Sequence, residues 1–79
     1  MSIAYDPLQV RARIARINLN LALTISQRYL AEKLNRSEPS ISLALTRQEG
    51  TTISKRPELL ARIVRHLDHL EGKPLRKEK

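Results

Sequence analysis

The side chains that could carry chemistry in this 79-residue chain are basic and polar rather than nucleophilic. The chain holds 15 Lys and Arg against 8 Asp and Glu, a formal net charge of +7, and it has no cysteine. Disulfides and thiolate zinc sites are therefore excluded, and nothing argues for an oxidising compartment. Two histidines, His66 and His69, lie three residues apart, yet a metal site needs further ligands and a pocket, so we expect no bound metal.

The remaining residue types predict no enzyme. The two glycines, Gly50 and Gly72, cannot form a glycine-rich phosphate loop, and no Ser/His/Asp set is placed for nucleophilic catalysis. We therefore expect no catalytic residues and no cofactor. The positive charge favours phosphate polyanions or an acidic membrane surface as partner. The membrane is the weaker candidate, because the chain has no Trp or Phe for the interface and no apolar run of bilayer length.

Helices that pack together through aliphatic side chains must position these basic and polar residues. Hydrophobic residues make up 41% of the chain but aromatic residues only 3%, which suits packed helices in one small domain. We expect that domain to cover residues 1–72 and to be followed by a flexible basic tail over residues 73–79. A chain this short is marginally stable alone, so a partner subunit would support it.

The first predicted helix begins at Pro7, with Asp6 as its N-cap, and stops near Leu23. Its apolar residues recur at helical spacing and form one core-facing stripe, made of Val10, Ile14, Ile17 and Leu21. Three arginines lie off this stripe and are expected in solvent: Arg11, Arg13 and Arg16.

Two short helices should follow, separated by a three-residue turn. Ser26 can cap the first of them, which continues through Leu34. Asn35 tolerates the left-handed backbone that the turn requires, and Ser37 can cap the second helix, which ends before Gly50. Two such helices in a basic domain suggest a helix-turn-helix.

The segment from Ile25 to Leu45, ISQRYLAEKLNRSEPSISLAL, resembles the helix-turn-helix of the lambda-repressor/Cro-like (XRE) family of transcriptional regulators. Ala31 stands where that family needs a small residue so that the two helices can cross closely. The chain departs from the family at Asn35, where glycine is most frequent, and at Thr24, where a glycine commonly ends the first helix. The resemblance implies a small all-α, lambda-repressor-like DNA-binding domain of four or five helices, with the motif over residues 26–46. The family's packing positions are matched by Leu30, Leu34, Ile41 and Leu45.

In that family the second helix of the motif enters the major groove, which implies two sets of site residues here. The positions that would read bases are Glu38, Pro39, Ser42, Leu43 and Thr46. The positions that would contact phosphates, and so set the register without reading sequence, are Gln27, Arg28, Arg36, Ser37 and Arg47.

A last helix is predicted from Pro57 to Glu71, with Gly72 as its stop. Its apolar residues form two edges, one of Leu60, Val64 and Leu67 and the other of Leu59, Ile63 and Leu70. One edge can cover the motif while the other meets a second subunit; the alternative is that both edges fill the chain's own core. A two-fold dimer would place two motif helices ~34 Å apart on a near-palindromic operator.

These patterns predict a small helix-turn-helix protein that binds double-stranded DNA as a homodimer. The family implies a phage- or prophage-type transcriptional repressor that acts by promoter occlusion. No basic segment followed by an apolar stretch opens the sequence, so we expect a protein of the cytoplasm. The resemblance implies that it is bacterial or phage-encoded and associated with the nucleoid. The alternative is a non-enzymatic protein-interaction module, antitoxin-like or a phage adaptor, that uses the helical domain as a scaffold. We expect neither a small-molecule substrate nor a membrane partner.

Overall fold

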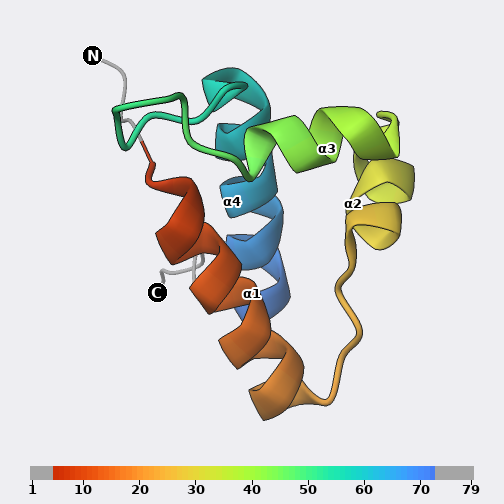
Figure 1. Cartoon of the computed structure of the whole chain (residues 1–79). Coiled ribbons are helices and arrows are strands. Elements are labelled where there is room, and N and C mark those ends of the chain that lie inside the picture. Colours follow the sequence, from red (N-terminus) through yellow and green to blue (C-terminus); the bar gives the residue numbers. More distant parts are fainter. Residues whose placement is uncertain (1–4, 73–79) are drawn as a thin grey trace.

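The protein is described by a computed structural model over residues 5–72; the basic tail predicted over residues 73–79 lies outside the described residues. The described part forms four α-helices and no strand: α1 (Pro7–Leu21), α2 (Gln27–Leu34), α3 (Glu38–Ala44) and α4 (Pro57–Glu71). α4 packs against each of the other three helices, and α2 packs against α3 (Figure 1). The all-α prediction is therefore confirmed for residues 5–72.

Each of the first three helices begins at the side-chain cap that the sequence predicts. Asp6 Oδ1 accepts a hydrogen bond from the N–H of Leu8 at 3.0 Å. Ser26 Oγ caps α2 by accepting from the N–H of Tyr29 at 3.1 Å, and Ser37 Oγ accepts from an N–H in the first turn of α3. These caps satisfy backbone donors that have no partner within the helix, which is why the starts could be placed accurately.

The end of α1 differs from the prediction. The helix stops at Leu21, two residues before the expected Leu23, because Ala22 takes a left-handed conformation (φ 53°, ψ 41°). The side chain of Asn18 then holds the returning loop: its Oδ1 accepts from the N–H of Ile25 at 2.8 Å and its Nδ2 donates to the Ile25 carbonyl at 3.2 Å. These two hydrogen bonds fix the turn between α1 and α2 without a glycine.

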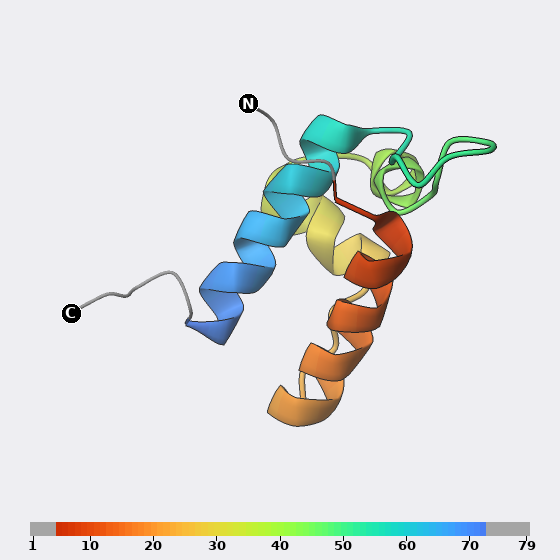
Figure 2. The same ribbon diagram turned by 90° about the vertical axis from the view of Figure 1, so that its left-hand side faces the viewer.

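All four helices contribute to the core, and three of the four residues in the predicted α1 stripe belong to it. Val10, Ile14 and Ile17 are buried, but Leu21 is 47% exposed. Figures 1 and 2 show the reason: the last turn of α1 extends beyond the other helices, and an extended loop returns from it to α2. The rest of the core is aliphatic and consists of Ile25, Leu30, Ala31, Ile41, Ala44, Leu45, Leu59, Leu60, Ile63, Val64 and Leu67.

A twelve-residue loop joins α3 to α4, and its two arms meet at an antiparallel bridge between Arg47 and Ser54. Ser54 anchors the loop: it is 1% exposed and its Oγ donates to the carbonyl of Ala44 at 2.6 Å. The same Oγ accepts from the N–H of Arg56 at 2.9 Å. These bonds fix the path of the chain as it enters α4.

Candidate nucleic-acid interface

α2 and α3 pack against each other across the predicted three-residue turn. Asn35 is left-handed (φ 58°, ψ 49°), as the sequence predicts. The N–H of Arg36 donates to the carbonyl of Ala31 at 2.8 Å, which closes the end of α2. Ala31 is 4% exposed and Ile41 is fully buried, so the small residue and the apolar residue both lie between the helices. This arrangement holds α3 with one face free.

The free face of α3 carries the residues predicted to read bases. Glu38, Pro39 and Leu43 are exposed, and Ser42 is half-buried. At 3.6 residues per turn these four positions lie on one side of the helix, opposite Ile41 and the other buried residues. The fifth residue differs, because Thr46 follows the end of α3 and its Oγ1 donates to the carbonyl of Ser42 at 2.7 Å. Its hydroxyl is therefore used within the chain.

Of the two residues at the start of α2 that are predicted to contact phosphates, Gln27 borders a hollow between α1 and α2, and Arg28 does not. Gln27 is half-buried there and lines the hollow together with Ser26 and Leu45. Arg28 is exposed, and its Nε lies 3.7 Å from Glu32 Oε2, a solvent-exposed pair that contributes little to stability. Ser37 is exposed and its Oγ caps α3.

Arg47 is not available as predicted. Its Nε donates to Asp6 Oδ1 at 3.0 Å and its Nη2 to Asp6 Oδ2 at 2.6 Å, a two-pronged contact that ties the loop after α3 to the start of α1. The hydrogen bond from Arg47 is the main reason that the pKa of Asp6 is lowered. Because a carboxylate already compensates the charge, the contact has a structural role and the predicted phosphate contact has no support here.

The remaining predicted cation, Arg36, has neighbours that the sequence reasoning missed. It lines a hollow of about 340 Å³ at the start of α4, together with Ser40 of α3, Lys55, Arg56 and Arg62. None of these four cations forms an ion pair with a carboxylate in residues 5–72, although Glu58 lines the same hollow. The signal was present in the sequence as a Lys-Arg pair directly before Pro57, where a helix begins.

The start of α4 adds to the positive potential of this hollow. Arg56 is its N-cap residue and supplies no side-chain hydrogen bond to the first turn. The free N–H groups of a helix N-terminus and its macrodipole attract anions, as do the surrounding guanidinium groups. The arrangement can therefore bind an oxyanion such as a backbone phosphate.

The two hollows lie on either side of the free face of α3. Leu45 borders the hollow at the start of α2 and Ser40 the hollow at the start of α4. These two residues are five positions apart, which corresponds to a rotation of about 140° about the helix axis, measured across the side that faces the core. The exposed residues of α3 therefore occupy the wider arc on the opposite side.

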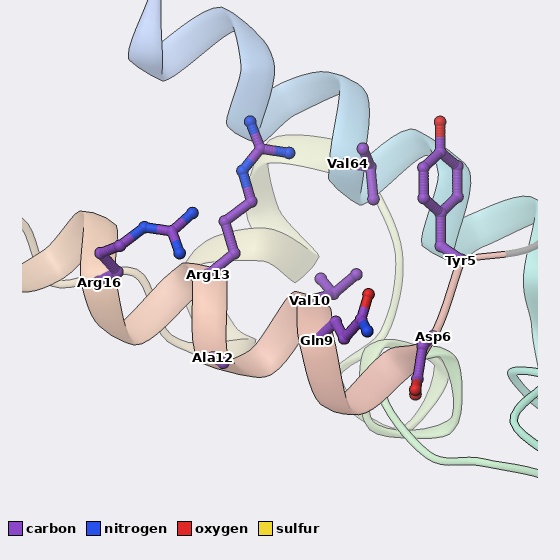
Figure 3. Close-up of a pocket in the computed structure, with 8 residues that line it drawn as sticks. All are labelled: Tyr5, Asp6, Gln9, Val10, Ala12, Arg13, Arg16 and Val64. Carbon is purple, nitrogen blue, oxygen red and sulfur yellow. The ribbon is translucent and has the colours of Figure 1, made fainter.

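Two of the three arginines of α1 are exposed as the sequence predicts, and Arg13 is the exception. Arg13 is held by two carboxylates of α4: its Nε donates to Glu71 Oε1 at 3.0 Å, and Nη2 also contacts Asp68 (Figure 3 shows Arg13 reaching toward α4). Burial lowers the pKa of Arg13, but the bonds to Glu71 and Asp68 outweigh this effect and raise it. Arg11 and Arg16 are exposed, as predicted, and neither forms an ion pair in the described range. Arg11 Nε also donates to the carbonyl of Leu45 at 2.6 Å.

The residues predicted to form a dimer contact pack against other residues of the same chain. Five of the six side chains are no more than 8% exposed, and the sixth, Leu70, is half-buried against the same core. Both apolar edges of α4 therefore fill the chain's own core, which was the alternative interpretation, because three helices surround this one. The homodimer stays a prediction without an assigned interface. The six residues are Leu59, Leu60, Ile63, Val64, Leu67 and Leu70.

The two histidines lie on the edge of α4 that faces α2. Tyr29 is half-buried, and its hydroxyl is hydrogen-bonded to His66 Nε2 at 3.0 Å. Burial lowers the pKa of His66, and the nearby charges of His69 and Lys33 lower it further. His66 therefore loses its proton more readily than an ordinary histidine does.

The sequence matches no protein-family model, and no curated protein or solved structure matches it either. The resemblance to the lambda-repressor/Cro-like family thus rests on the residues of the motif alone. Within residues 5–72, no helix combines the length and the apolar composition needed to cross a bilayer.

Proposed function

We propose that this protein binds double-stranded DNA, with α3 in the major groove and backbone phosphates at the starts of α2 and α4. The observation that supports this best is the hollow lined by Arg36, Lys55, Arg56 and Arg62, which lies directly beside the exposed face of α3. Lysine and arginine side chains that neutralise phosphates release counterions, which supplies most of the sequence-independent affinity. The residues on α3 would then discriminate between bases.

The face offered to the bases has a definite chemistry. Glu38 can accept a hydrogen bond from a cytosine amino group, and Ser42 can either donate or accept. Pro39 and Leu43 can contact thymine methyl groups. With two apolar contacts and no arginine, asparagine or glutamine among these four residues, direct readout is expected to be modest. Binding at a promoter would then act on transcription by occlusion, as a repressor of the phage or prophage type does.

A salt titration tests the electrostatic part of the proposal. We expect the wild-type protein to bind a mixed-sequence duplex, with affinity falling steeply between about 50 and about 200 mM salt. Lys55→Gln/Arg56→Gln should weaken binding to all duplexes about tenfold and reduce the magnitude of the log–log salt slope by about 1 to 2, because each lost phosphate contact contributes ~0.9. Arg16→Gln, an exposed arginine of α1, is the matched control and should change neither quantity. A wild-type protein that binds no duplex at low salt would refute the proposal.

Selection from a random duplex library tests the role of α3. Leu43→Ala or Ser42→Arg should change the preferred sequence, whereas Arg36→Ala should weaken binding without changing the preference. If the preferred sequence survives every substitution on the free face of α3, this helix is not the reading element.

A separate observation supports the alternative of a protein-interaction module. Three leucines at the end of α1 and in the loop after it are exposed, namely Leu19 at 82%, Leu21 at 47% and Leu23 at 39%. Exposed apolar side chains in one segment of a chain can form a contact surface. Sedimentation of the wild type and of Leu19→Ser/Leu23→Ser discriminates: association that the variant abolishes would support this function, and a monomer that binds DNA would argue against it.

A further inference from the structure

The edge of α4 that faces α2 carries four basic side chains at helical spacing. Arg62, Arg65, His66 and His69 follow one another at intervals of three, one and three residues, so they share one side of the helix. Together with Leu34 of α2 they line a hollow of about 360 Å³. Below, this surface is called the α2 edge. It continues the hollow at the start of α4, because Arg62 lines both.

Positive charge on the α2 edge is not balanced by the protein. No carboxylate lines the hollow, and neither Arg62 nor Arg65 forms an ion pair with any residue in the described range. From α2, Lys33 lies close enough to lower the pKa of His66, and its Nζ stands 5.6 Å from the centre of the Tyr29 ring. Like charges three or four residues apart on a helix are destabilising, so this concentration of cations has a cost in the free protein.

We infer that the α2 edge binds a phosphate-bearing polyanion, as a second site next to the proposed DNA interface. Arginine supplies paired donors that match phosphate oxygens, and a histidine that becomes protonated adds a further donor. Arg62 and Arg65 lie one helical turn apart, which suits neighbouring phosphate groups rather than one isolated phosphate. The phosphates could belong to a free polyphosphate or nucleotide, or to nucleic acid that extends past the start of α4.

The two histidines of the chain both line the hollow, so they report on binding there. We expect inorganic tripolyphosphate to shift the ring resonances of His66 and His69 in a saturable way, and to raise the pKa of His66 because an adjacent anion favours the protonated ring. His66→Gln assigns the two signals. This measurement contains no DNA, so its result is independent of whether the proposed function holds.

Arg65 lies on the α2 edge but does not line the hollow at the start of α4, which makes it the informative substitution. Arg65→Gln should weaken tripolyphosphate binding about tenfold, since a charge-assisted contact to phosphate is lost. Arg16→Gln, an exposed arginine on α1, is the control and should bind as the wild type does. Circular dichroism of both variants checks that the fold is unchanged. Equal losses of tripolyphosphate binding in the two variants would overturn the inference.

Two further experiments identify the source of the phosphates. If free tripolyphosphate binds and weakens binding to a duplex through the shared Arg62, the site serves a soluble polyanion. If only a duplex longer than the motif's own site shifts His66 and His69, and Arg65→Gln abolishes that shift, the site serves nucleic acid. Both results support a phosphate site, whereas histidine signals indifferent to tripolyphosphate and to long duplexes alike would refute it.

Discussion

The edge of α4 that faces α1 and the edge that faces α2 differ in how their charges are balanced. On the edge that faces α1, Asp68 and Glu71 form ion pairs with Arg13, and all three side chains are at least half-buried. On the second, the α2 edge defined above, Arg62 and Arg65 have no carboxylate partner within residues 5–72. One helix thus carries charges that hold the fold together and charges that the fold does not use.

The same contrast divides the arginines that the sequence treats as equivalent. Arg13 and Arg47 each bind a carboxylate from a distant part of the chain, and this contact joins two elements. Arg36 and Arg56 face a hollow instead. Net charge alone therefore overstates the number of cations that can meet a polyanion, and the local supply of carboxylates decides which arginines remain available.

Removing Arg13 should give the largest effect on stability. Arg13→Ala leaves Asp68 and Glu71 close together without a cation, in a site where the arginine side chain is only 18% exposed. We expect a loss of about 1–2 kcal/mol in the free energy of unfolding, between the values for exposed ion pairs and for buried hydrogen bonds to charged groups. In a domain of this size the melting temperature should fall by about 5–10 °C.

The control for this substitution is Arg16→Ala, one turn further along α1 and exposed. It should change the free energy of unfolding by less than about 0.5 kcal/mol, as substitutions at exposed sites without partners usually do. Urea unfolding of the two variants measures the difference. Equal stability of both would mean that the α1 edge of α4 is not a structural contact.

Reversing a charge on the α2 edge should have a smaller effect of opposite sign. Arg65→Glu removes the repulsion from Arg62 and gives His69 a carboxylate one turn away, so stability should rise by about 0.3–0.5 kcal/mol. The same change should abolish tripolyphosphate binding. Stability that rises while binding is lost would distinguish a functional cation from a structural one, and a destabilised variant would contradict the contrast between the two edges.

The sequence predicted much of this fold because its information is local. Caps at Asp6, Ser26 and Ser37, the left-handed Asn35 and the stop at Gly72 all act within a few residues, and the structure confirms each of them. The end of α1 was placed wrongly because it depends on the side chain of Asn18 reaching Ile25.

The partners of the charged residues could not be read in the same way. Arg47 meets Asp6 across 41 residues of sequence, and Arg13 meets Glu71 across 58. Such contacts depend on how the helices pack, and no regular spacing of residues in the sequence indicates them. Lys55 and Arg56 were missed for a related reason, because only the folded chain brings them beside Arg36. The positions predicted on α3 needed no such information, since the resemblance to the lambda-repressor/Cro-like family implies them.

The smallest effect concerns His66, whose pKa is lowered by burial and by the charges of His69 and Lys33. Tyr29, Arg62 and Arg65 are the other polar groups on the surfaces around it, and none of them is anionic. The unfolded chain, with an ordinary histidine pKa near 6.5, binds a proton more readily than the folded protein does. The stability that His66 contributes is therefore complete above about pH 6.5 and is lost as the pH falls through the lower value of the folded state.

Urea unfolding between about pH 7.5 and about pH 5.5 measures this loss, since most carboxylates stay ionised over that range. His66→Gln should remove much of the pH dependence, and His69→Gln should reduce it because one neighbouring charge is gone. Tripolyphosphate should flatten it in the wild type, because an anion on the α2 edge stabilises the protonated ring in the folded state. If the free energy of unfolding falls equally with pH in the wild type and in His66→Gln, the cations of the α2 edge do not act on this histidine. The contrast between the two edges of α4 would then rest on the ion pairs of Arg13 alone.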